Sequence, residues 1–227
     1  MRLNYNLTVH NDKVPYLEIK DLYSEDERKR LLEEMLAFEK LGVLIPGWKT
    51  GTASEKWTGQ PKKQNNGFFT HGFFGPNGYE ELSIGQMYDK RLLDFLSKDK
   101  DFRKDGGWHF NIDFKEPMHL SSLVSYYEDS DYYLPHSDHA WCTALTWFYV
   151  EPKKFKGGVL SFSDYNIDIE PELNKTIIFP SQVNHAVSPV KIQDKDKGKG
   201  LGRFVMSTFI QLPRTIWDNP PKEKITL

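Results

Sequence analysis

Short segments rich in β-branched and aromatic residues follow one another from residue 107 onward, and this pattern constrains the fold more than any other feature of the chain. Turn-forming residues separate eight candidate strands, at about 107–113, 119–127, 133–138, 142–150, 158–163, 175–179, 184–190 and 203–211. Short strands at this spacing are typical of sandwiches and barrels, and eight are enough for a double-sheet jelly roll. We therefore expect a mainly β core with flanking helices, which makes the chain α+β.

Two helical segments are expected before these strands. Ser24 and Glu27 form a capping-box pattern, and helical apolar spacing then continues as far as Gly42, which predicts a helix over 24–41. A weaker periodic stretch predicts a second helix over about 79–98. Both helices are expected to support the sheet.

The chain of 227 residues fits one structural domain, since β domains of this size often lack a second core. We expect an N-terminal helical and loop support region over 1–106, the β core over 107–212 and a C-terminal tail over 213–227. Within the first region, residues 43–78 are dense in Gly, Asn, Lys and aromatic side chains without clear periodicity. Long loops in compact domains are often functional, so this segment is either a substrate lid or a plain surface excursion.

Charge and cysteine content narrow the possible partners and the location. The formal net charge of −2 gives no global attraction to nucleic acid or anionic lipid. No stretch approaches the roughly 18 apolar residues of a membrane span, and the first residues lack the apolar region of a secretory signal. Cys142 is the single cysteine, so no internal disulfide can form and a reducing compartment is the simpler inference. We expect a cytoplasmic protein with no membrane partner, and nucleic acid is disfavoured as a partner.

A His-x-Asp triplet, His136 to Asp138, lies between two strand-like runs, SSLVSYY before it and WCTALTWFYV after it. Alternate side chains of an extended chain share one face, so His136 and Asp138 could ligate one metal ion together. A second triplet, His10 to Asp12, lies in a polar, turn-like stretch and is interpreted as a chance occurrence.

His185 follows the apolar run TIIFP and a short turn, from which it could reach the same metal ion from a different strand. Two imidazoles and one carboxylate can occupy one face of a ferrous ion and leave the opposite positions open for a co-substrate and dioxygen. A structural histidine and a Zn²⁺ site with hydrolytic chemistry remain alternatives for these residues.

Arg203 begins an alternating strand in which Arg203, Val205 and Ser207 share one face. A buried guanidinium without a partner is very costly, whereas a carboxylate satisfies its planar fork with two hydrogen bonds. An inward-facing Arg203 therefore predicts either a bound anionic ligand or a structural salt bridge to an acidic side chain.

Several landmarks follow one another in order between about 119 and 212. They are Tyr126, YLPHSDH around the triplet, GGVLSF at 157–162, IEP at 169–171, IIFPSQVNHAV at 177–187 and RFVMSTF at 203–209. This ordered set resembles the Fe(II)- and 2-oxoglutarate-dependent dioxygenases, and within them the prolyl 4-hydroxylase-like branch. The resemblance implies a double-stranded β-helix (jelly-roll, cupin-like) core.

The resemblance also implies the cofactors and their ligands. Fe(II) would be held by His136, Asp138 and His185, which are then the catalytic residues. Arg203 would bind the distal carboxylate of 2-oxoglutarate, with the hydroxyls of Tyr126 and Tyr149 as further contacts. O2 is the other co-substrate, and the reaction hydroxylates an unactivated C–H bond while 2-oxoglutarate becomes succinate and CO2.

The sequence departs from the prolyl hydroxylase pattern at two positions. Collagen-type prolyl hydroxylases have lysine where this chain has Arg203, so the resemblance is closer to the hypoxia-type enzymes. The residue two positions later is Val205 and not the serine of the Arg-x-Ser enzymes.

Three hypotheses about the function follow. The leading one is hydroxylation of a prolyl residue in a peptide or protein, because the aromatic side chains of residues 43–78 suit proline rings and extended peptide. A free amino acid or small metabolite is the alternative substrate, since one iron core serves many substrates. A non-catalytic jelly-roll binding module is the alternative of another class. Arg203 argues against it, and a structural barrel does not need an open triad.

Overall fold

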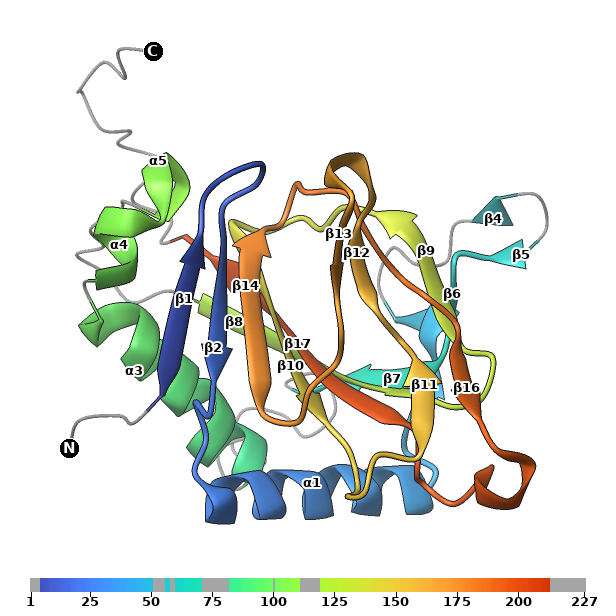
Figure 1. Ribbon diagram of the computed structural model, residues 1–227. Helices are drawn as coiled ribbons and strands as arrows, with labels where there is room; N and C mark the ends of the chain where they lie inside the picture. The colour runs from blue at the N-terminus through green and yellow to red at the C-terminus, as the bar shows by residue number, and fades with distance from the viewer. Residues whose placement is uncertain are drawn as a thin grey trace.

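The computed structural model describes residues 5–50, 56–57, 60–70, 82–99, 101–110 and 119–212. Two antiparallel sheets pack against each other, and helices cover the outer face of the larger sheet (Figure 1). In spatial order the larger sheet contains β1 (Asn6–His10), β2 (Tyr16–Lys20), β14 (Lys175–Pro180), β10 (Cys142–Phe148), β17 (Arg203–Gln211), β8 (His119–Tyr127), β7 (Asn66–Phe69) and β3 (Ile45–Pro46). The smaller sheet contains β13 (Ile167–Ile169), β12 (Leu160–Phe162), β15 (His185–Val187), β9 (Tyr132–His136) and β6 (Lys63–Gln64). This architecture confirms the predicted mainly β fold with a double-stranded β-helix core.

Two short ladders and several helices complete the described structure. The ladders pair β11 (Phe155–Gly157) with β16 (Val190–Ile192), and β4 (Lys56–Trp57) with β5 (Gln60–Pro61). The α-helices are α1 (Glu25–Lys40), α3 (Lys90–Lys98), α4 (Asp101–Asp105) and α5 (Gly107–Phe110). Short 3-10 turns lie at Gly47–Lys49, Ser163–Tyr165 and Asp194–Asp196. None of the described helices is long and apolar enough to cross a lipid bilayer.

Helix α1 begins where the capping box predicts. The Ser24 hydroxyl accepts a hydrogen bond from the Glu27 N–H (3.3 Å), and the Glu27 carboxylate accepts one from the Ser24 N–H (2.8 Å). These two bonds satisfy backbone donors that a helix N-terminus otherwise leaves free. The apolar face of α1 buries Leu31, Met35 and Phe38 against the larger sheet. The helix predicted over 24–41 is confirmed.

The larger sheet divides the hydrophobic interior into two layers because side chains alternate along each strand. On one face, Val124, Phe204 and Met206 pack with residues of α1 and α3. On the other face, Tyr127 and Val205 pack with residues of the smaller sheet. The face between the two sheets is the one that holds the functional site.

The segment predicted as a helix over 79–98 is described from residue 82. It begins as a π-helix, η3 (Ile84–Asp89), and continues directly as α3. Its buried residues include Ile84, Tyr88, Leu92 and Phe95, which pack on the outer face of the larger sheet. The predicted supporting role of this helix is therefore confirmed, while the π-helical start was not anticipated.

Two parts of the strand prediction were wrong. Residues 107–110 form the short helix α5, and residues 111–113 lie outside the described part of the chain. The N-terminal region contributes strands β1 and β2 to the larger sheet, where β2 pairs with β14. Each of these strands has five residues, and their apolar alternation is too short to stand out in the sequence. The tail predicted over 213–227 also lies outside the described residues.

The segment 43–78 is more regular than a loop. Strand β7 pairs with β8 in the larger sheet, and β6 pairs with β9 in the smaller sheet. The chain therefore passes from one sheet to the other between residues 64 and 66 and joins them along one edge. Residues 51–55, 58–59 and 71–78 lie outside the described structure, so the lid hypothesis stays a prediction.

Candidate metal and co-substrate site

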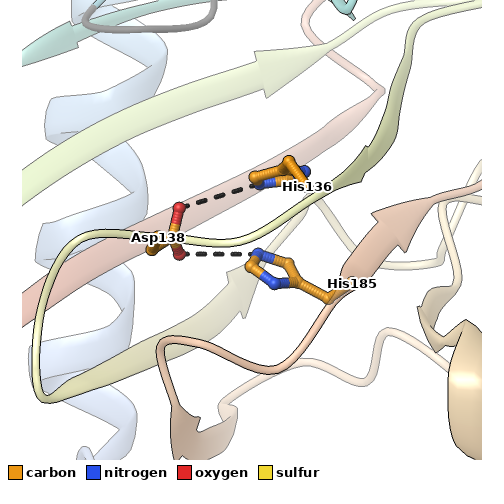
Figure 2. Close-up of side chains that lie close together, drawn as sticks. All are labelled: His136, Asp138 and His185. Carbon is orange, nitrogen blue, oxygen red and sulfur yellow. Dashed lines mark ion pairs between the residues drawn. The ribbon is translucent and has the colours of Figure 1, made fainter.

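Three ligand-type side chains converge between the two sheets. His136 ends β9, Asp138 follows it by two residues, and His185 begins β15. Strands β9 and β15 are antiparallel neighbours in which His136 and His185 lie directly opposite each other. The ligand atoms of the three residues all lie within 4.8 Å of one another. Figure 2 shows both imidazoles directed at the Asp138 carboxylate.

Backbone hydrogen bonds orient the two imidazoles. The Nδ1 atom of His136 is 2.9 Å from the Leu134 carbonyl oxygen, and that of His185 is 2.9 Å from the Val183 carbonyl oxygen. Each Nδ1–H therefore donates to a carbonyl, which leaves the lone pair on Nε2. These Nε2 atoms lie 3.7 Å and 3.5 Å from the two Asp138 carboxylate oxygens.

The Asp138 side chain is held in place as well. The Thr143 hydroxyl donates to Oδ2 of Asp138 (2.7 Å), and the Asp138 N–H donates to the Ser181 carbonyl (2.8 Å). Burial, together with the neighbouring His185, lowers the pKa of His136 to about 2, so this imidazole is neutral at neutral pH. Neutral imidazole nitrogens facing carboxylate oxygens are electron-pair donors without a proton between them, and a divalent cation satisfies such a set. The donor chemistry therefore fits Fe(II).

A cavity of about 690 Å³ opens beside these ligands. Its walls come from both sheets and include the apolar side chains Leu145, Val187 and Val205. Arg203 lies in the same cavity and is fully buried. The predicted inward face of β17 is confirmed, since Arg203, Val205 and Ser207 all line this cavity.

Arg203 has no anionic partner among the described residues. None of its three guanidinium nitrogens makes a hydrogen bond there, while the guanidinium carbon lies 4.7 Å from the centre of the Tyr127 ring. Burial lowers the pKa of Arg203 to about 10, and the neighbouring Tyr127 opposes this shift. The side chain is thus a buried cation at neutral pH, and the alternative of a structural salt bridge has no support among the described residues. Burying such a group without an anion costs stability, and a bound anion removes much of that cost.

Gly158 makes room for this arginine. A Cβ at that position would lie 2.7 Å from Cδ of Arg203, and the φ of +67° is a left-handed conformation that favours glycine. The second glycine of the GG pair thus has a steric reason, because it lets the chain before β12 pass close to the buried arginine side chain.

The structure does not bring the two predicted tyrosines into the cavity. Tyr126 lies on the opposite face of β8, where its hydroxyl donates to Glu128 (2.7 Å) and accepts from the Gly202 N–H (3.1 Å). The Tyr149 hydroxyl accepts a hydrogen bond from the Leu173 N–H (3.0 Å), away from the cavity lining. Tyr127, one residue after the predicted position, lies opposite Arg203 in the β8–β17 register and lines the cavity. Burial raises the pKa of Tyr127 to about 12, although Arg203 opposes the shift, so its hydroxyl stays protonated and can donate.

Lys63 is a cavity residue that the sequence reasoning missed. Its side chain comes from β6, is only 3% exposed and lines the same cavity as Arg203 and the three ligands. Burial lowers the pKa of Lys63 to about 8, and Asp138 opposes this shift. Lys62 lines the same cavity but is only half-buried. No sequence signal distinguishes the two lysines, because the burial of Lys63 depends on pairing with β9, which lies far along the chain.

The second triplet plays no part in this site. His10 is the last residue of β1 and not part of a bare turn, and its ring stacks on Tyr16 at a centroid distance of 4.1 Å. Among the described residues, the one group of three ligand-type side chains close enough to hold a metal ion is His136, Asp138 and His185.

Comparison with known proteins agrees with this geometry. The model of the 2OG-Fe(II) oxygenase superfamily matches residues 122–211, which include all three ligands and Arg203. No curated protein matches the chain significantly. The matched part of the chain is thus similar to the 2OG-Fe(II) oxygenase superfamily, and the His-Asp-His ligand set fits the Fe(II) that this superfamily uses together with 2-oxoglutarate and O2.

Solved structures show the same fold in prolyl hydroxylases. A prolyl hydroxylase from Trichoplax adhaerens, in complex with a hypoxia inducible factor peptide fragment, has a TM-score of 0.57 at 12% identity, covering 90% of this chain and 86% of that one. A prolyl-4-hydroxylase from Pseudomonas putida has 0.55 at 15% identity, with 87% and 92% covered. The viral collagen prolyl hydroxylase of Paramecium Bursaria Chlorella virus-1 has 0.51 at 17% identity, with 87% and 96% covered. At these identities the likeness establishes the fold.

Proposed function

We propose that this protein is a dioxygenase that uses Fe(II) and 2-oxoglutarate, and that it hydroxylates an unactivated C–H bond of a prolyl residue in a peptide or protein while 2-oxoglutarate is converted to succinate and CO2. The observation that carries the proposal is the cavity that holds both a His-Asp-His ligand set and an unpaired buried arginine. The fold likeness to prolyl hydroxylases favours proline as the target.

In this proposal His136, Asp138 and His185 hold Fe(II), and Thr143 keeps the Asp138 carboxylate oriented through its hydrogen bond. The bound metal supplies the activation of O2 that the reaction needs. Arg203 binds the distal carboxylate of 2-oxoglutarate with two charge-assisted hydrogen bonds. Tyr127, directly opposite Arg203, takes the role that the sequence assigned to Tyr126 and Tyr149.

The apolar part of the cavity has two tasks. Leu145, Val187 and Val205 exclude water from the space between the ligand set and Arg203. They also hold the bound 2-oxoglutarate in a fixed orientation, because a well-oriented reactant avoids much of the entropic cost of the reaction.

The test is an anaerobic titration. Fe(II) and 2-oxoglutarate are added to the apoprotein, and the visible charge-transfer band of the chelate is recorded for wild type, His185→Ala and Arg203→Ala. We expect a band in wild type, its loss in His185→Ala and a weaker band at equal 2-oxoglutarate in Arg203→Ala. A proline-containing peptide panel is then assayed for succinate and for a mass increase of one oxygen. Absence of the band in wild type would contradict the proposal.

A small substrate is the second candidate. Lys63 places an ammonium group in the same cavity, and a free amino acid carries a carboxylate that could bind it. Free amino acids assayed beside the peptides separate the two candidates, since one of the two sets should give substrate-dependent succinate.

A further inference from the structure

Lys63 reaches the metal site from the edge of the smaller sheet. Strand β6 pairs with β9 so that Lys63 lies directly opposite Tyr133, and its Nζ is 5.2 Å from the centre of the Tyr133 ring. The Tyr133 ring stacks on the His136 imidazole at a centroid distance of 3.5 Å. One aromatic ring therefore separates this ammonium group from a proposed ligand of the metal. Figure 1 shows β6 beside β9, where β6 forms one edge of the smaller sheet.

No acidic side chain forms an ion pair with Lys63 among the described residues, and the Asp138 carboxylate acts on it only from a greater distance. Its Nζ has one hydrogen-bond partner there, the Thr50 hydroxyl at 3.4 Å, which is uncharged and near the limit for such a bond. Lys175 is the matched comparison, because its side chain is equally buried but pairs with Glu172 at 2.7 Å. Buried lysines are normally paired in this way, so the missing partner of Lys63 points to an anion from outside the chain.

In the proposed function, 2-oxoglutarate does not bind Lys63. The proposed function places one end of 2-oxoglutarate on Arg203 and the other on the metal, and Arg203 projects from β17 of the larger sheet. Lys63 projects into the cavity from the opposite, smaller sheet. A second anionic group in the cavity is then supplied by the molecule that is hydroxylated.

We infer that Lys63 binds a carboxylate of the primary substrate, so the preferred substrate carries a carboxylate close to the carbon that is hydroxylated. The inference rests on the proposed function. The carboxylate has two possible sources, the α-carboxylate of a free amino acid or an acidic side chain next to proline in a peptide. Thr50 contributes as a neutral neighbour of the ammonium group.

The experiment compares Lys63→Met and Lys63→Arg with wild type. Lys49→Met is the control, because Lys49 lies exposed on the preceding 3-10 turn and does not line the cavity. Two probe pairs are used, free L-proline against L-prolinamide, and a capped peptide with glutamate beside proline against the same peptide with glutamine. Dissociation constants are measured anaerobically by calorimetry on the protein loaded with Fe(II) and 2-oxoglutarate, and KM and kcat are measured in air.

In wild type, we expect one carboxylate probe to bind more tightly than its neutral partner. Lys63→Met should weaken that probe by about tenfold or more, as expected for loss of a buried charged hydrogen bond. The neutral partner and 2-oxoglutarate should change by less than about twofold, and Lys63→Arg should recover part of the affinity. The pair that responds identifies the source of the carboxylate. Thermal melting of each variant verifies that it is folded.

Three results would overturn the inference. Equal loss of affinity for both members of a pair would show that Lys63 supports the fold of the cavity. Weaker 2-oxoglutarate binding alone would assign Lys63 to the co-substrate. If wild type binds the carboxylate probe and the neutral probe of each pair equally tightly, then a carboxylate on the substrate does not contribute to binding. The charge-transfer band of wild type separates these outcomes from failure of the proposed function, which would abolish the band itself.

Discussion

The two faces of the larger sheet differ in how their strands β8 and β17 satisfy buried polar groups. On the helix-covered face, the Ser122 hydroxyl donates to Asp89 (2.8 Å) and lies 2.9 Å from the Thr208 hydroxyl. On the cavity face, the three nitrogens of Arg203 and the hydroxyl of Ser125 have no partner among the described residues. Both sets of residues include side chains of β8 and β17, the same pair of neighbouring strands.

This difference distinguishes polar groups that stabilise the fold from polar groups that bind a ligand. Native interiors satisfy nearly all buried polar groups, so the network around Asp89 is what a stable core requires. Unsatisfied groups on the other face cost stability, and a chain retains them where a ligand supplies the missing partner. Neighbouring residues of one strand point to opposite faces of the sheet. One residue can therefore belong to a fully hydrogen-bonded core while the next residue faces a ligand cavity.

The largest effect is expected from His185→Ala. Removing one of three ligands should weaken Fe(II) binding by a factor on the order of one hundred or more, in line with the strength of metal–imidazole bonding. His139→Ala is the control, because His139 lines the cavity but is not part of the ligand set. Equilibrium dialysis with Fe(II) under anaerobic conditions measures both variants. Unchanged iron affinity in His185→Ala would mean that the cavity between the two sheets does not bind iron through this residue.

Arg203→Met should have the next largest effect. Loss of a buried, hydrogen-bonded charge pair costs about 2–5 kcal/mol, so the Kd of 2-oxoglutarate should rise by about thirtyfold or more. Without 2-oxoglutarate, the variant should be at least as stable as wild type, since the substitution removes an unpaired buried charge. Titration of the charge-transfer band and urea unfolding give the two values. A large loss of stability without ligand would indicate that Arg203 serves the fold.

Asp89→Asn tests the helix-covered face of the larger sheet through the pH dependence of stability. Burial raises the pKa of Asp89 from 3.8 to about 7, although the hydrogen bond from Ser122 opposes the shift. The folded state therefore holds a proton that the unfolded state releases, and wild-type stability should fall as the pH rises from about 4 to 7. This difference between the pKa of Asp89 in the folded state and its ordinary value corresponds to about 4 kcal/mol of stability. The neutral amide keeps an oxygen for Ser122 and removes this loss.

Urea unfolding of wild type and Asp89→Asn at pH 4, 6 and 8 makes the measurement. We expect similar stabilities at pH 4 and a more stable variant at pH 8. Equal stabilities at pH 8 would show that Asp89 is ionised in the fold at no cost, which would weaken the contrast between the two faces.

The smallest effects are expected from the neighbouring tyrosines. Tyr127→Phe should raise the Kd of 2-oxoglutarate by about three- to tenfold, as loss of one hydrogen bond predicts. Tyr126→Phe should leave that Kd unchanged and lower the free energy of unfolding by about 1 kcal/mol, because its hydroxyl bonds Glu128 and Gly202 on the helix-covered face. The same titration and urea unfolding apply to both variants. The reverse pattern would restore the prediction made for Tyr126 from the sequence.

These tyrosines also mark where sequence reasoning stops. The face occupied by Arg203 follows from alternation within one strand, because Val205 and Ser207 share it. The role of Tyr126 was implied by the family resemblance, and alternation from His136 could not test it, because the turn over residues 128–131 interrupts the alternation between β8 and β9. A shift of one residue exchanges the two faces of a strand, and so the neighbouring Tyr127 was overlooked.

The sequence by itself determined the features that depend on local spacing: the capping box at Ser24, the shared face of His136 and Asp138, and the alternating strand that begins at Arg203. Only the tertiary structure decided that β1 and β2 extend the larger sheet, that Tyr127 faces Arg203 and that Lys63 enters the cavity. Each of these depends on pairing between strands far apart in the chain. Such pairing is set by the burial of whole faces and leaves little trace in the residues on either side.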